Sequence, residues 1–180
     1  MTATVVAPGA FDVLDACHRQ AVAMLARLSD LVSGLDQGDP SREAREAAEE
    51  IIQFFSQTAR QHHEDEERHV FPRLLGSDNP ETVQAVLRLQ QDHHWMDVDW
   101  SELSPALAAI AAGQGGYDAA ALREGVEIFT VLTHDHIALE ESCIYSQAGE
   151  RFGGAELQQA AREMAKRRRV RSAPAAAADS

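Results

Sequence analysis

The sequence predicts an all-α protein, an antiparallel up-down-up-down four-helix bundle followed by a short C-terminal helix or tail. Three observations support this fold class. Ala, Leu, Glu and Gln outnumber the β-branched residues, which favours helices over strands. Four long segments carry apolar residues at alternating steps of three and four, the spacing of one helix face. Gly- and Pro-containing stretches separate these segments, and 180 residues suffice for one domain with its own core.

The first two predicted helices are separated by the sequence GLDQGDP. The first runs from about residue 12 to residue 36, and its stripe is Leu14, His18, Ala21, Leu25, Leu28, Val32 and Leu35. The second begins after Pro40, where Ser41 can cap the helix N-terminus, and ends near Pro72 and Gly76. Its inner face is predicted to be Ala48, Ile52, Phe55, Ala59, His62, Glu66 and Val70.

The third and fourth predicted helices follow the same pattern. The third begins after Asn79 and Pro80, ends at the glycines of residues 113–116, and carries Val86, Leu89, His93, Met96, Trp100, Leu103, Leu107 and Ile110. The fourth opens near Asp118 and is expected to bury Leu122, Val126, Phe129, Thr133, His136, Glu140 and Cys143. We expect residues 1–155 to form the bundle and residues 156–180 a basic C-terminal helix and disordered tail, with the disorder over 171–180.

The charge distribution restricts the function classes. The formal net charge is −13, yet six of the 16 basic residues lie in 162–171, which leaves an acidic body that argues against nucleic acid and is compatible with cations. Two distant cysteines, no apparent secretory signal and no 18-residue apolar run predict a cytoplasmic protein without a membrane span. The basic run 166–169 is interpreted as solvated, which leaves open both a protein partner at the tail and the oligomeric state.

The chemistry is concentrated in two repeated motifs. The sequence QHHEDEERHVFP at 61–72 places His62 four residues before Glu66, and HIALEE at 136–141 places His136 four residues before Glu140. Positions four apart lie on one face of a helix, so each pair can bind the same metal ion. Two such pairs in similar surroundings indicate a metal site more strongly than one pair does.

The four histidines on the predicted stripes lie at one height of the bundle. Neighbouring helices joined by short loops pack antiparallel, so residues that meet are equally distant from their shared loop. His62 and His93 each lie 14 residues from their loop, and His93 and His136 each lie 20 residues from theirs. For His18 and His62 the distances are 20 and 22 residues, a mismatch of about 3 Å along the helix axis.

A buried group of four imidazoles and two carboxylates would lack partners unless it binds metal. These six donors are too many for one tetrahedral zinc ion. Shared over two ions with bridging carboxylates, they leave open positions, and mixed nitrogen and oxygen donors suit iron or manganese, with the histidine content favouring iron. The predicted metal ligands are His18, His62, Glu66, His93, His136 and Glu140.

Several neighbouring residues leave alternatives open. Whether one of them replaces or joins the six ligands is not decided by the sequence; these residues are His63, His94, His134 and Asp97. His69 forms an ExxH pair with Glu66, as in ferritin-like bundles, but no second ExxH pair occurs in the third or fourth helix. Glu67 and Glu141 are predicted to be solvated or to orient the ligating imidazoles. Cys143 is interpreted as an inert core residue.

These motifs resemble the hemerythrin-like, HHE cation-binding domain over residues 11–148. The matching elements are His18 in ACHRQ, the HHEDEERHVFP sequence, His93 in QDHHW, and HIALEES. The resemblance implies an antiparallel four-helix bundle with a non-haem di-iron centre, two iron ions bridged by an oxo or hydroxo group, with manganese or zinc less favoured. It assigns the same six ligands, with Glu66 and Glu140 as bridging carboxylates.

The sequence departs from the oxygen-carrying members of that family. Asp97 stands where they have a second histidine on the third helix, and Glu140 stands where they have an aspartate. It is closer to four-histidine, two-glutamate members, some of which are linked to nitric oxide, peroxide or iron handling. We therefore expect a protein that binds or senses O2, NO or peroxide. An enzyme that turns over peroxide or NO, or an iron donor or store, is the alternative, and the sequence does not decide whether the protein is an enzyme.

Overall fold

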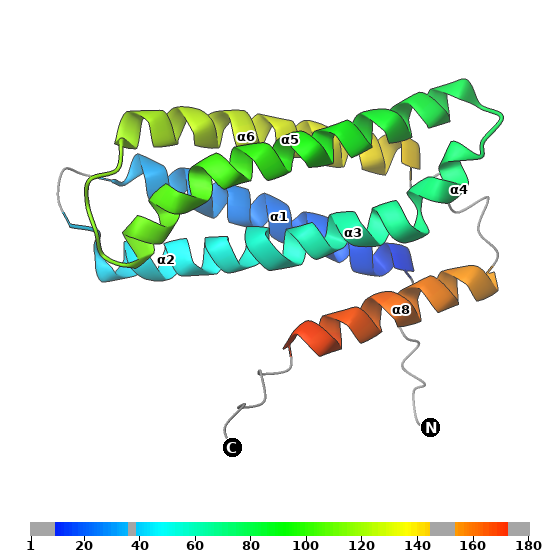
Figure 1. Cartoon of the computed structure of the whole chain (residues 1–180), viewed down its shortest axis with the longest axis horizontal. Helices are drawn as coiled ribbons and strands as arrows, with labels where there is room; N and C mark the ends of the chain where they lie inside the picture. Colours follow the sequence, from blue (N-terminus) through cyan, green and yellow to red (C-terminus); the bar gives the residue numbers. More distant parts are fainter. Residues whose placement is uncertain (1–9, 36–38, 145–153, 173–180) are drawn as a thin grey trace, which may run out of the picture.

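The computed structural model describes residues 10–35, 39–144 and 154–172, and this part of the chain is helical without strands. The all-α prediction is confirmed (Figure 1). The elements in chain order are α1 (Ala10–Ser33), α2 (Arg42–Gln53), η1 (Phe54–Ala59), α3 (Arg60–His69), α4 (Phe71–Leu75), α5 (Pro80–Ala111), α6 (Ala119–Leu139), η2 (Glu140–Ile144) and α8 (Gly154–Ser172). None of the helices in these ranges is both long and apolar enough to cross a lipid bilayer.

The helices begin where the sequence places capping residues. Ser41, Asn79 and Asp118 each accept hydrogen bonds of 2.9 to 3.1 Å from backbone N–H groups in the first turn of α2, α5 and α6. These bonds satisfy donors that a helix N-terminus leaves without partners. The glycines after α5 also act as predicted, because Gly113 and Gly116 have φ values of 71° and 91°, which side-chain-bearing residues rarely adopt.

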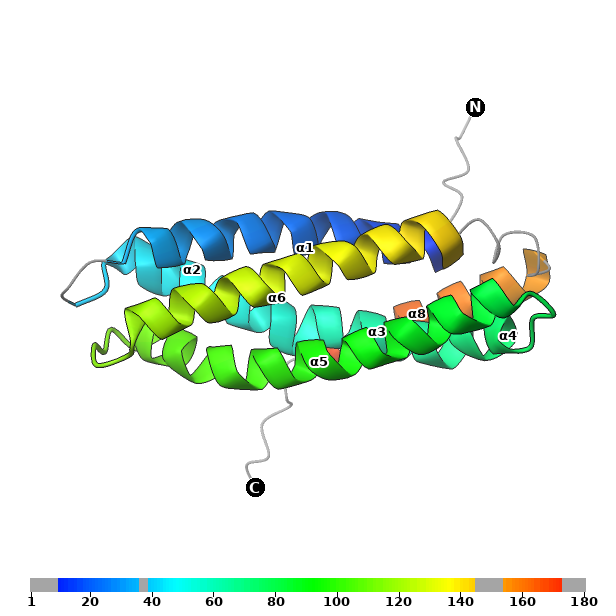
Figure 2. The same ribbon diagram turned by 90° about the horizontal axis from the view of Figure 1, so that it is seen from above.

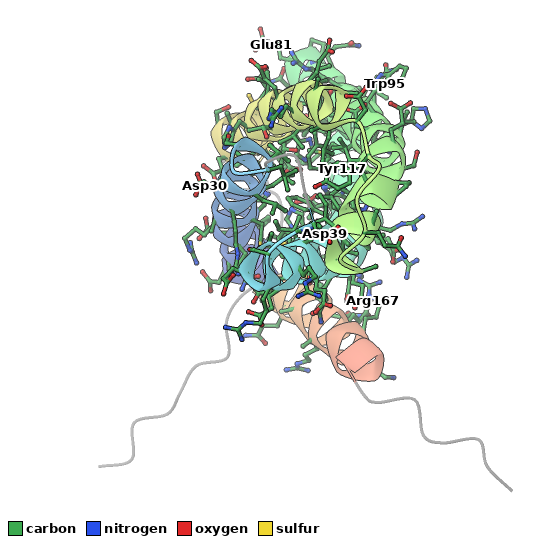
Figure 3. The ribbon with its side chains drawn as sticks, turned by 90° about the vertical axis from the view of Figure 1, so that its left-hand side faces the viewer. Asp30, Asp39, Glu81, Trp95, Tyr117 and Arg167 are labelled. Atoms are coloured by element: carbon green, nitrogen blue, oxygen red, sulfur yellow. The ribbon has the colours of Figure 1, made fainter. Side chains whose placement is uncertain are left out.

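Figures 1 and 2 show α1, the α2–α3 segment, α5 and α6 lying lengthwise beside one another, and the chain turns back between successive segments. The α2 helix packs against both α1 and α5, and α6 also packs against both. Seen along this bundle in Figure 3, the helices surround an interior filled by side chains, while Asp30 and Glu81 lie on the outside. Side chains from all of these segments therefore meet in one core.

Two π-helical turns change which residues face that core. In a π turn the backbone hydrogen bond spans five residues instead of four, which rotates the helix face that follows. In α2, just before η1, Ile51 is fully buried, whereas the predicted Ile52 is partly buried and packs against the core. In η2, Ile144 is fully buried and Cys143 is only partly buried, which corrects the prediction of a core Cys143.

The core consists of two apolar clusters. The larger one includes Phe55, Leu107 and Phe129, and the smaller one includes Leu14, Phe71 and Leu89. The basic C-terminal helix α8 belongs to the smaller cluster, because Met164 is fully buried there. Disorder was predicted from residue 171, but α8 continues through Ser172, so the prediction was wrong for these two residues. Residues 173–180 lie outside the described part of the chain.

Candidate metal centre

The structure brings together the six side chains that the sequence singled out. They come from α1, α3, α5, α6 and η2, and each is at most 5% exposed: His18, His62, Glu66, His93, His136 and Glu140. The near-equal numbers of residues between the four histidines and their shared loops therefore correctly predicted that these histidines lie close together. Imidazole and carboxylate groups of this kind are costly to bury unless a partner satisfies them.

Four of the six form what we call the His18 cluster: His18, His62, Glu66 and Glu140. The two Nε2 atoms of His18 and His62 are 2.9 Å apart. His18 Nε2 also lies 3.0 Å from an Oε2 atom of Glu140, and His62 Nε2 lies 3.2 Å from Oε1 of Glu66. Two nitrogens bound at a right angle to one ion with bonds of about 2.1 Å would lie about 3.0 Å apart. The spacing in this cluster therefore fits a shared cation.

The second group, which we call the His93 cluster, contains Glu66, His93, His136 and Glu140. Here the Nε2 atom of His93 lies 3.6 Å from Oε2 of Glu66, and that of His136 lies 3.4 Å from Oε2 of Glu140. Both glutamates are shared with the His18 cluster. Glu66 turns one carboxylate oxygen toward each cluster, which is the arrangement of a carboxylate between two cations.

Outer carboxylates contact the other nitrogen of three of these imidazoles. Glu67 lies 2.9 Å from Nδ1 of His93, and Glu141 lies 3.4 Å from Nδ1 of His18. Of the two roles that the sequence left open for Glu67 and Glu141, these contacts favour the one that orients the imidazoles. Asp92, which the sequence did not single out, lies 3.9 Å from Nδ1 of His136, within ion-pair range but without a hydrogen bond. Such a carboxylate fixes the ring orientation and tautomer of a ligating histidine.

Asp92 could have been found from the helix period. It lies three residues after Leu89 and four before Met96, and thus on the same stripe of α5 as these two buried residues. The regular stripe assigns only one of two adjacent residues to the interior, and the prediction gave that position to His93 rather than to Asp92. Asp92 is 7% exposed, so both members of this pair face the interior.

The structure shows which of the alternative ligand candidates lie near the two clusters and which do not. His94 and His134 are exposed, and His69 lies beside Arg167 and Glu163 of α8, away from the ferritin-like pairing with Glu66. His63 is partly buried and forms a third group with His93 and His136, whose ligand atoms lie within 4.8 Å of one another. Asp97 is exposed but contributes to the wall of a neighbouring cavity.

The charges of the site balance only in part. Burial, together with Glu140, raises the pKa of Glu66 well above its usual value. Burial also lowers the pKa of His62 well below 6.5. Burial also disfavours the charged forms of His136 and Glu140, but their mutual attraction outweighs it. Glu140 and Asp92 raise the pKa of His136 to about 9. His136 in turn keeps the pKa of Glu140 well below its usual value. A bound cation would stabilise both carboxylates as anions.

The donors fit a metal ion by a further test. Both carboxylate oxygens of Glu66 and Glu140, and the Nε2 atoms of His93 and His136, have no hydrogen-bond partner within the described part of the chain. These unpartnered buried atoms all belong to the His93 cluster, and a cation bound among them would satisfy them. The two clusters contain imidazoles and carboxylates but no thiolates, a donor set that suits iron or manganese.

A small cavity adjoins the centre. Its volume is about 40 Å³. The imidazoles of His18, His62, His63 and His136 line part of it, and apolar side chains such as Phe55 and Phe129 line much of the rest. A cavity needs about 10–15 Å³ by this measure to hold one water molecule. The space therefore admits a few atoms beside the imidazoles and excludes a large organic substrate.

Comparison with known proteins agrees with this site. The sequence profile of the hemerythrin HHE cation binding domain matches residues 9–148. A protein of Haemophilus influenzae, described as uncharacterized, is 28% identical over 161 residues, which are 89% of this chain and 90% of that protein. The matched range contains both clusters, and the buried histidines and glutamates correspond to the type with four histidines and two glutamates. The chain belongs to the hemerythrin HHE cation-binding domain family.

Proposed function

We propose that this protein holds two iron ions without haem and binds or senses O2, NO or peroxide at open iron positions. The observation that carries the proposal is the sharing of Glu66 and Glu140 between the His18 and His93 clusters. One ion would leave one of these imidazole pairs unused, whereas two ions use all four imidazoles and both carboxylates. When bound, such a centre supplies electrons and Lewis acidity to a small ligand.

The residues of the chain would hold and enclose this ligand. His18 and His62 would bind one ion, His93 and His136 the other, and Glu66 and Glu140 would bridge them. The cavity beside the centre, about 40 Å³ in volume and largely apolar, has room for a diatomic molecule or a peroxide. Three outer carboxylates would keep the imidazole rings in position by facing the Nδ1 atoms of the histidines. They are Glu67, Glu141 and Asp92.

We also propose a helix topology, a cellular compartment and a class of partner for this protein. We place α1, α2–α3, α5 and α6 in an antiparallel up-down-up-down bundle, which agrees with the arrangement in Figures 1 and 2. We assign the protein to the cytoplasm because Cys17 and Cys143 are both free thiols, as a reducing compartment favours. The partner is a small ligand rather than nucleic acid or a membrane.

The test is the metal content per chain together with an optical spectrum. Protein purified without oxygen should contain about two iron ions per chain and should gain near-ultraviolet absorption bands in air. The iron(II) protein is then mixed with one equivalent of O2, NO or hydrogen peroxide. A stable, saturable spectral change supports binding or sensing, whereas steady consumption of peroxide or NO would show an enzyme instead. One zinc ion per chain, or no metal after anaerobic purification, would overturn the proposal.

A further inference from the structure

The cavity beside the metal centre has an exposed side, at the edge between α3 and α5. Most of the side chains that line the cavity are buried or partly buried, and the exposed ones are Arg60 of α3 and Asp97 of α5. We propose that small ligands reach the centre through an opening between Arg60 and Asp97, and that these two charges select among the ligands. The inference rests on the proposed ligand binding at the centre and adds the route and the residues that control it.

Contacts between side chains close this edge on both sides of the opening. The α5 helix packs against α2 and α4, which precede and follow α3 in the chain. Between these two helices, Nε1 of Trp100 donates a hydrogen bond of 3.0 Å to Oγ of Ser56. Further along the edge, the rings of His63 and His93 stack with their centroids 4.0 Å apart. These two contacts mark the limits of the opening.

Arg60 and Asp97 lie in the helical turn between those contacts. Arg60 is four residues after Ser56 and three before His63, so it shares a helix face with both. Asp97 has the equivalent place on α5, between the two residues of that helix that make the contacts. Within the described residues, no hydrogen bond or ion pair joins Arg60 to Asp97. Two exposed side chains that are not linked leave this part of the edge open.

A surface groove continues outward from the opening. The groove has a volume of about 350 Å³ and is lined by Ser56, Gln57, Arg60 and Glu64. Ser56, Gln57 and Arg60 are exposed, so the groove is accessible to solvent. Arg60 lines both the groove and the cavity. The two spaces therefore adjoin at Arg60, and a molecule in the groove is separated from the cavity by this side chain.

The two charges at the opening act in opposite ways on a charged ligand. The formal net charge of the chain is −13, so its overall field repels small anions. The guanidinium of Arg60 is always protonated and attracts an anion at the opening, whereas the carboxylate of Asp97 repels it. A molecule without net charge, such as O2, NO or hydrogen peroxide, is affected far less. Arg60 and Asp97 therefore set the rate at which anions enter, and the width of the opening sets the rate for every ligand.

Ligand association with the iron protein tests the route. The probes are azide, a small anion, and NO, a neutral molecule, and stopped-flow absorbance gives the rate constants of binding and release. Asp97→Phe places a ring in the opening and should slow binding and release of both probes at least about fivefold. The dissociation constants should not change, because a residue on the route alters the barrier and not the bound state.

The control for this variant is Glu127→Phe, at an exposed position of α6 that is not part of the cavity wall. It should bind both probes at the wild-type rates. Wild-type rates in Asp97→Phe at equal iron content would overturn the inference, and so would a changed dissociation constant with an unchanged rate of binding.

Two charge variants test the selection. Arg60→Gln should slow the binding of azide by about three- to tenfold at low ionic strength, whereas Asp97→Asn should accelerate it, and neither should alter the binding of NO. Added salt should remove these differences, because it screens charges at the surface. The control is Arg42→Gln, which removes an exposed arginine at the start of α2. An azide rate in Arg60→Gln equal to that of the control would overturn the inference.

A metal-free measurement separates this inference from the proposed function. The chain has two tryptophans, and Trp95→Phe leaves Trp100, which lines the cavity, as the only one. The metal-free full chain is used, with its helix content checked by circular dichroism. In this background iodide should quench the fluorescence of Trp100 about twofold less in Arg60→Gln and more in Asp97→Asn. Unchanged quenching in both would overturn the inference, whereas an iron protein that binds neither azide nor NO would count against the proposed function.

Discussion

The His93 cluster is more firmly held in place than the His18 cluster, although the two look alike in the sequence. In the His93 cluster, Nδ1 of His93 lies 2.9 Å from Glu67, and Phe71 stacks on the His93 ring with the ring centroids 5.5 Å apart. In the His18 cluster, Glu141 contacts Nδ1 of His18 at the longer distance of 3.4 Å. The second imidazole of each cluster, His62 or His136, has an Nδ1 atom without a hydrogen-bond partner among the described residues. The two copies of the HxxxEE motif thus contribute to two candidate metal sites whose ligands are held in place to different degrees.

This difference predicts that the two ions leave in a fixed order. Ligands that are held by outer hydrogen bonds need less ordering when they bind a metal, and they release it more slowly. We expect the ion of the His18 cluster to exchange first and that of the His93 cluster to remain.

The largest effect is expected from Glu66→Gln, because this carboxylate borders both clusters. The variant should contain close to no metal, which elemental analysis would measure. Its metal-free form should unfold at a higher temperature than metal-free wild type, since burial raises the pKa of Glu66 and the variant no longer buries an acid there. The control is Glu49→Gln on the exposed surface of α2. Retention of two ions by Glu66→Gln would show that Glu66 is not shared.

His62→Ala should affect one position only. In wild-type protein an added chelator should remove metal in two phases, the faster one from the His18 cluster. His62→Ala should lack the fast phase and keep about one ion, because its remaining ligands in that cluster are too few to hold metal. Stopped-flow absorbance of the chelator complex measures both phases. If His62→Ala instead loses the slow phase, the order of stability inferred from the outer carboxylates is reversed.

The pH dependence should also distinguish the clusters. In the metal-free protein the pKa of His136 is about 9, so this imidazole carries a proton at neutral pH that a metal ion must displace. Binding to the His93 cluster should therefore strengthen as pH rises toward 9, by up to about tenfold per unit for one proton released. His62, whose pKa is lowered, is already neutral at pH 7 and adds no such dependence. Calorimetric titration with cobalt(II) in two buffers of different ionisation enthalpy measures the protons released. Equal proton release at both positions would contradict this difference.

The smallest effects are expected from the outer glutamates. Glu67→Gln should weaken the His93 cluster by about 10–100-fold, the range usual for a partner of a ligating histidine. Glu141→Gln should weaken the His18 cluster less, because its contact is longer, at 3.4 Å against 2.9 Å. Both side chains are about half exposed, so each serves as the control for the other. Affinities from competition with a chelator would reveal the ranking.

Much of the fold could be predicted because local signals and the overall structure agree. Ser41, Asn79 and Asp118 fix three helix starts through hydrogen bonds within their own turns. Equal distances of His62 and His93 from their loop then placed these two residues at one height. Both kinds of inference depend only on helix geometry, which is the same in every α-helix.

The remaining details could not be predicted for an equally physical reason. A regular period of 3.6 residues carries no sign of the π turns η1 and η2. Within η2, Ile144 rather than Cys143 is fully buried, and just before η1 the fully buried residue is Ile51 rather than Ile52. The period also assigns one residue per turn to the interior, whereas His62 and His63, like Asp92 and His93, are neighbours that both turn inward. Packing between helices decides such cases.

The packing of α8 has a practical consequence for anyone who prepares this protein. The family match ends at residue 148, yet Met164 lies fully buried in the same apolar cluster as Phe71 and Leu74. Arg167 of the same helix also contacts the fully buried Asp65, next to Glu66 in the sequence. A gene trimmed to the family boundary would therefore encode a protein with a bare apolar surface, prone to aggregate and short of a support beneath its metal-binding helix. For this chain, the unit to clone and to crystallise extends through α8.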